Sequence, residues 1–78
     1  MMEIDEDKID RTVLALLRLT LHDGERAWKY HDWAVTNRLF KKGFIHNPVG
    51  KAKSVGLTEE GLRESERLFN EMFGKTET

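Results

Sequence analysis

The sequence contains no cysteine and a single proline, Pro48. Without cysteine, disulfides and thiolate metal sites are excluded. Long hydrophobic runs are absent too: the longest apolar-rich stretch, residues 13–21, contains Arg18 and is far shorter than the roughly 20 residues that span a bilayer. The start, MMEIDEDKID, is acidic, whereas a signal peptide starts with basic residues. We therefore expect a cytoplasmic protein with no membrane contact.

An excess of charge of one sign is also missing, since the formal net charge is −1. The charge is nevertheless unevenly distributed along the chain. Residues 1–25 carry a net charge of −4, residues 26–53 carry +6, and residues 54–78 carry −3. A basic middle between acidic ends predicts an electrostatic footprint on one element of the fold and not a uniformly cationic surface.

With 78 residues, the chain is expected to form one domain, ordered from about residue 5 to residue 74. Apolar residues at three- and four-residue spacing predict a first helix over residues 5–22, capped by Asp5, and its wide leucine face could serve as a dimer seam. A second helix is expected over residues 33–42, with Asp32 as its cap and Gly43 at its C-terminal end. Its inward-facing residues are expected to be Val35, Thr36, Leu39 and Phe40. Thr58 is expected to cap a third helix, which Gly74 ends.

Between the first two helices lie HDGERAWKYHDW and a cluster of aromatic residues. We expect a short helical turn over residues 25–30. Trp28, Tyr30 and Trp33 are interpreted as core anchors, the commoner role of such residues in a small protein. The alternative is a stacking platform for bases or for a partner.

Residues 44–57 are expected to form a β-hairpin. Asn47, Pro48, Val49 and Gly50 suit the four positions of a type I turn, and Val55 and Leu57 alternate toward the core. The fold class predicted from these elements is α+β and mainly helical: a three-helix core with a two-stranded hairpin.

Two resemblances follow from these motifs. The stretches RLFKKGFI and SVGLTEEGL resemble a winged helix-turn-helix of the multiple-antibiotic-resistance repressor type, through Leu39, Gly43, Phe44 and Ile45 and then residues 57–61. That resemblance covers about half the chain and implies that the hairpin is a wing. A Trp-Lys-x-x-Asp-Trp pattern and the stretch PVGKAKS are similar to a small bacterial family of domains of unknown function, over nearly the whole chain.

No reaction is indicated. Gly50 and Lys51 fail as a phosphate loop, because Ala52 replaces the metal-binding hydroxyl and a strand is expected to follow where a helix is required. The three histidines lack paired spacing, so no metal site is expected. Ser54 and Ser65 lack a recognisable base partner, and no cofactor or small-molecule ligand is evident. We expect a protein that is not an enzyme.

The basic middle suggests two functions. In the first, the chain is a nucleic-acid-binding or regulatory module. Asn37, Arg38 and Lys41 then approach the groove of double-stranded DNA, and Lys51 and Lys53 contact phosphates. In the second, the chain is a protein-interaction or dimerisation module that does not bind DNA, and it forms a stable dimer or binds a specific partner. For both functions, a homodimer through the first helix is expected.

Overall fold

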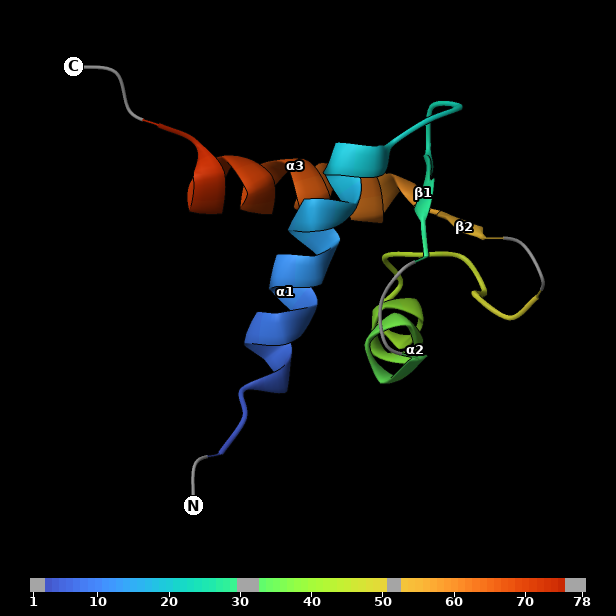
Figure 1. The fold of residues 1–78 in the computed structure, drawn as a ribbon, viewed down its shortest axis with the longest axis horizontal. Coiled ribbons are helices and arrows are strands. Elements are labelled where there is room, and N and C mark those ends of the chain that lie inside the picture. Colours follow the sequence, from blue (N-terminus) through green and yellow to red (C-terminus); the bar gives the residue numbers. More distant parts are fainter. Residues whose placement is uncertain (1–2, 30–32, 51–52, 76–78) are drawn as a thin grey trace.

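The computed structural model describes residues 3–29, 33–50 and 53–75. The elements, in chain order, are α1 (Glu6–Leu16), a 3₁₀ helix η1 (Leu17–Thr20), β1 (Arg26–Trp28), α2 (Trp33–Lys41), β2 (Ser54–Gly56) and α3 (Glu59–Phe73). In Figure 1, the upper end of α1 overlies α3, and the rest of α1 extends below it. Helix α2 lies beside the lower half of α1, and the strands lie on the same side of α1 as α2. The predicted class, α+β with three helices, is confirmed.

The first helix begins where the sequence predicts. Asp5 caps it, because its Oδ1 accepts a hydrogen bond of 2.9 Å from the backbone N–H of Lys8. The α-helical part ends earlier than expected, at Leu16, and the next turn tightens into η1. Leu14 and Leu17 face the core, whereas Leu19 is 67% exposed.

The expected helical turn at residues 25–30 is wrong, because residues 26–28 form strand β1. This strand pairs antiparallel with β2 in the register Arg26↔Gly56, Ala27↔Val55 and Trp28↔Ser54. Ala27 and Val55 are both buried, so the pairing places one apolar pair in the core. Local propensity therefore yields to a tertiary contact.

Among the described residues of the predicted hairpin, Ile45 and Leu57 form the bridge between its two arms. His46 N–H donates to the Gly56 carbonyl at 2.8 Å, beside that bridge. The turn is closed locally, since Asn47 Oδ1 accepts from the Val49 N–H at 3.0 Å. Strand β2 therefore pairs along its length with β1, and not with the first arm of the predicted hairpin.

Helix α2 ends at Lys41, and Gly43 terminates it as predicted. This glycine has a φ of +83°, a conformation that side chains with a Cβ rarely adopt. Its N–H donates to the Phe40 carbonyl, and the Phe44 N–H donates to the Leu39 carbonyl, both at 3.0 Å. These two bonds are the Schellman pattern. Asp32, the predicted cap at the other end, lies outside the described residues.

The start of α3 is fixed against the chain that follows α2. Thr58 caps the helix through a 3.0 Å bond from the Gly61 N–H, and its hydroxyl donates to the Gly43 carbonyl at 2.6 Å. Gly61 touches the same segment, because a Cβ built there would collide with the carbonyl oxygen of Phe44. Only glycine permits this approach of two backbones.

The core gathers residues from every element. Its buried apolar members are Val13, Leu14, Ala15, Leu17, Ala27, Val35, Leu39, Ile45, Val55, Leu57 and Leu68. The predicted aromatic anchors are not among them: Trp28 is 47% exposed and Trp33 is 60% exposed, while Tyr30 lies outside the described residues. Phe40, which the helical pattern places inside, is 40% exposed. These three positions correct the sequence-based expectation.

Candidate functional site

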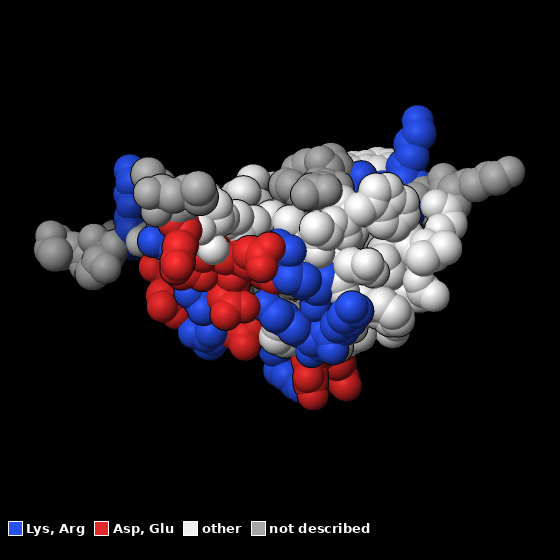
Figure 2. Space-filling model, turned by 90° about the horizontal axis from the view of Figure 1, so that it is seen from below, with Lys and Arg blue, Asp and Glu red and all other residues white. Residues whose placement is uncertain are grey.

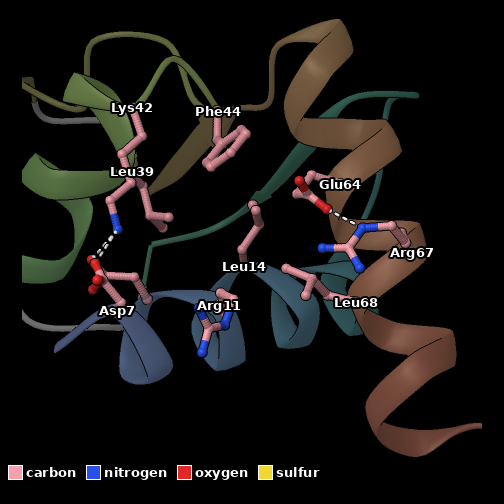
Figure 3. A pocket seen from close by; sticks show the side chains of 10 residues that line it. Asp7, Arg11, Leu14, Leu39, Lys42, Phe44, Glu64, Arg67 and Leu68 are labelled. Atoms are coloured by element: carbon pink, nitrogen blue, oxygen red, sulfur yellow. Dashed lines mark hydrogen bonds and ion pairs between the residues drawn. The ribbon is translucent and has the colours of Figure 1, made fainter. Parts of the chain in front are cut away.

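A cleft of about 190 Å³ opens between the three helices (Figure 3). Its apolar surface comes from one leucine of each helix, Leu14, Leu39 and Leu68, and from Phe44. Its charged lining consists of Asp7, Asp10, Arg11, Lys42, Glu64 and Arg67. The two signs are equally represented there, so the lining carries no net charge that would favour an anion or a cation.

One wall of the cleft is held by a buried carboxylate. Asp10 is 1% exposed and accepts from Arg38 Nε at 3.0 and 2.8 Å and from Arg38 Nη2 at 2.8 Å. Lys42 Nζ adds a bond of 3.0 Å to the same carboxylate. Glu6 and Asp7 extend this ion cluster at the surface, each 3.1 Å from one of the two cations. The cluster joins the acidic start of α1 to the basic end of α2.

The ion cluster changes the acidity of its members. Burial alone would raise the pKa of Asp10, but the hydrogen bonds and charges of Arg38 and Lys42 outweigh it, and the pKa lies below its ordinary 3.8. The bond to Asp10 raises the pKa of Lys42 above its ordinary 10.5. Asp10 and Lys42 are therefore charged at neutral pH, and carboxylates of α1 pair with Arg38 and Lys42 within the fold.

The folded surface mixes the charges that the sequence keeps apart. Figure 2 shows acidic and basic side chains interspersed on the face that lies below in Figure 1. The segment with a charge of +6 does not form one open basic surface there, because α1 brings carboxylates against Arg38 and Lys42.

The outer face of α2 has a different character. Trp33, Asn37, Phe40 and Lys41 are exposed and lie within about 100° of one another around the helix axis, at 100° per residue. Val35, Thr36 and Leu39 form the opposite, buried face. We call the exposed set the outer face of α2. The aromatic rings of Trp33 and Phe40 are exposed there, beside the amide of Asn37 and the ammonium group of Lys41.

Lys29 connects this face to the turn after residue 46. Its Nζ donates to the Pro48 carbonyl at 2.8 Å and to the Gly50 carbonyl at 3.4 Å. The same nitrogen lies 5.8 Å from the centre of the Trp33 ring, in the range of a cation–π contact. Val49, at the tip of the turn, is 76% exposed. The ammonium group of Lys29 thus contacts both the carbonyls of the turn and the ring of Trp33.

The family described as Domain of unknown function (DUF6429) matches residues 5–75. The chain belongs to the DUF6429 family. It is also similar to "Uncharacterized protein y4hR" of Sinorhizobium fredii (strain NBRC 101917 / NGR234), at 62% identity over 72 residues, which cover 92% of this chain and 97% of that protein. No solved structure matches the chain significantly. The predicted membership of a family of unknown function is confirmed.

The structure of this DUF6429 chain separates the residues predicted to bind nucleic acid. Asn37 and Lys41 lie together on the outer face of α2, and Lys53 is exposed next to β2. Arg38 is turned toward α1, with its guanidinium on Asp10. Lys51 lies outside the described residues. Contact with nucleic acid stays a prediction for the exposed three.

Sequence reasoning missed the ion cluster and the exposed rings of the DUF6429 chain. A signal for the cluster was present: Asp10 lies three and four residues before Val13 and Leu14, in the apolar stripe of the first helix. A carboxylate in such a stripe requires a partner. For Trp33 and Phe40, the spacing of seven residues marks one shared face, but it does not say whether the face is buried.

Among the described residues of this DUF6429 chain, every helix is too short or too polar to cross a membrane. Within the same ranges, no three His, Cys, Asp or Glu side chains come together in a way that would hold a metal ion.

Proposed function

We propose that this DUF6429 chain is a reduced winged helix that serves as a protein-interaction module and does not bind nucleic acid. The order of elements supports a winged helix: α1, β1, α2, the Ile45 bridge, β2 and α3. The second part of the proposal rests on what is missing before α2. Only four residues separate β1 from α2, too few for the helix that positions a recognition helix on DNA.

The observation that carries the proposal is the direction of the Arg38 side chain. This residue is the strongest candidate on α2 for reading a base, yet its guanidinium makes three hydrogen bonds to the buried Asp10 carboxylate. Freeing it would remove three of the hydrogen bonds that stabilise this buried carboxylate and leave it the bond from Lys42. The outer face of α2 instead carries Trp33 and Phe40, residue types that are enriched at protein interfaces.

Two measurements test the proposal. The first is fluorescence anisotropy of a labelled mixed-sequence DNA duplex with the full chain across a salt series. We expect no saturable binding at about 0.15 M salt, where nonspecific DNA binders still bind with Kd values of roughly 10⁻⁴–10⁻⁶ M. The second is photo-cross-linking in cells from exposed positions on α2 and α3, which should capture a protein. Tight DNA binding that persists at that salt concentration would refute the proposal.

Nucleic-acid binding remains the second candidate, and one observation favours it. Asn37, Lys41 and Lys53 are exposed, and α2 contains no acidic residue. If this candidate is right, the logarithm of the binding constant falls with the logarithm of the salt concentration by about 0.9 for each phosphate contacted. Lys41→Ala plus Lys53→Ala should then lower that slope by about two.

A further inference from the structure

The outer face of α2 has no covering element in the part of the chain that the structure describes. Trp33 is 60% exposed and Phe40 is 40% exposed, although large aromatic side chains gain most from burial. They lie seven residues apart, two turns along the same side of the helix. Since side chains at this spacing engage partners as a pair of anchors, the face has the form of a docking site.

We infer that the outer face of α2 binds an acidic amphipathic segment of another protein. The inference rests on the proposed function and names the surface and the chemistry of the partner. Apolar side chains of that segment pack on Trp33 and Phe40, and its carboxylates pair with Lys41 and approach Lys29.

Charge complementarity decides the sign of the partner. The sequence of α2, WAVTNRLFK, has no acidic residue. Lys41 is exposed on the outer face, and Lys29 Nζ lies 5.8 Å from the Trp33 ring. The other two cations of this region, Arg38 and Lys42, are neutralised by carboxylates of α1. A positive charge thus flanks the aromatic pair at each end and attracts a segment rich in Asp and Glu.

A second copy of the chain suits this face less well. In a two-fold pairing of α2 with α2, Lys41 of each copy approaches the Trp33 end of the other, where Lys29 is already located. Such a pairing brings like charges together around an apolar contact, which opposes association. Duplex DNA suits it less well too, because the rings occupy the part of the helix that would face the bases.

The experiment uses two synthetic peptides and the full-length chain. The first peptide is a fluorescein-labelled 16-mer with Leu and Phe at i, i+4 and i+7 and with Glu and Asp at most other positions. The second has Lys in place of every Glu and Asp. In anisotropy titrations we expect saturable binding of the acidic peptide with a Kd in the micromolar range. The basic peptide should bind at least about tenfold more weakly.

Variants locate the binding face. Trp33→Ala and Phe40→Ala should each weaken binding of the acidic peptide at least about tenfold, as truncation of an interface anchor does. Lys41→Glu should weaken it by a similar factor and improve binding of the basic peptide. The matched control is Trp28→Ala, since Trp28 is also exposed, on β1, where its ring contacts the His22 ring at a tilt. That control should bind like the wild type. Thermal unfolding checks that each variant is folded.

Several outcomes would overturn the inference. They are an acidic peptide that does not saturate, a Trp33→Ala variant that binds as well as Trp28→Ala, a peptide displaced by duplex DNA, and a dimer in sedimentation that Trp33→Ala abolishes. Cross-linking separates this failure from that of the proposed function. A protein captured from Met72 of α3 but not from Phe40 leaves an interaction module with a different face. DNA binding at about 0.15 M salt refutes the module itself.

Discussion

Replacing Asp10 by Asn should cost this protein much of its stability. The carboxylate accepts three hydrogen bonds from Arg38 and one from Lys42, and Asn would turn an amide NH₂ toward these cations. Removing one partner of a buried ion pair costs about 3–5 kcal/mol. Here the two cation side chains keep 26% and 36% of their exposure, so water replaces part of the loss. We expect a destabilisation of about 2–3 kcal/mol.

Urea unfolding followed by circular dichroism measures this change in the free energy of unfolding. A domain of this size has a total stability of about 4–12 kcal/mol, so the effect is a large fraction. The melting temperature should fall by roughly 10–20 °C. Asp7→Asn is the matched control, because Asp7 has a 75% exposed side chain and one bond of 3.1 Å to Lys42. It should cost less than about 1 kcal/mol.

An equally small effect of Asp10→Asn and Asp7→Asn on the free energy of unfolding would contradict this prediction. That result would mean that Arg38 and Lys42 find equivalent partners in water, and that α2 is held to α1 by apolar packing alone. A changed slope of the free energy against urea would point to an altered unfolded or native state and would need a separate account.

Three further predictions follow from local geometry. The pKa of Asp10 is lowered in the folded state, so the stabilisation that its carboxylate provides is complete above the ordinary value of 3.8 and is lost as the pH falls through the lower folded value. Urea titration measures the difference in unfolding free energy between the wild type and Asp10→Asn. This difference should be constant from pH 7 to about pH 5 and shrink in more acid solution. Gly61→Ala should cost more than about 3 kcal/mol or prevent folding, since the methyl group collides with the Phe44 carbonyl, whereas Glu60→Ala should change the melting temperature little. Gly43→Ala should cost about 1–2 kcal/mol by thermal unfolding, because φ is +83° with open space around it, and Gly43→Asn should cost less.

The ends of the helices could be predicted from the sequence because their signals are local. Asp5 and Thr58 bond to backbone N–H groups three residues away, and Gly43 adopts the positive φ that its place after α2 requires. Each of these contacts lies within five residues of chain. Composition and spacing therefore contain the information, and no knowledge of the tertiary fold is needed.

The strand β1 and the ion cluster could not be predicted in the same way. Ala27 is a strand residue because it pairs with Val55, 28 residues later. Arg38 is equally far in sequence from Asp10, and only the packing of α2 on α1 shows that its charge is used inside the fold. The seven cations of residues 26–53 predict a basic surface, although carboxylates from the start of the chain pair with two of them, Arg38 and Lys42.

In the proposed binding mode, the ion cluster links recognition to Asp10, which lies on α1 and not on the outer face of α2. Helix α2 has only nine residues; it packs on α1, and the cleft separates it from α3. The bonds of Asp10 to Arg38 and Lys42 therefore help to fix the orientation of α2 and of its two rings. A selection for loss of partner binding should recover substitutions at position 10 along with those at 33 and 40. A second substitution that places a carboxylate near Arg38 and Lys42 should then restore binding, although the outer face of α2 is unchanged.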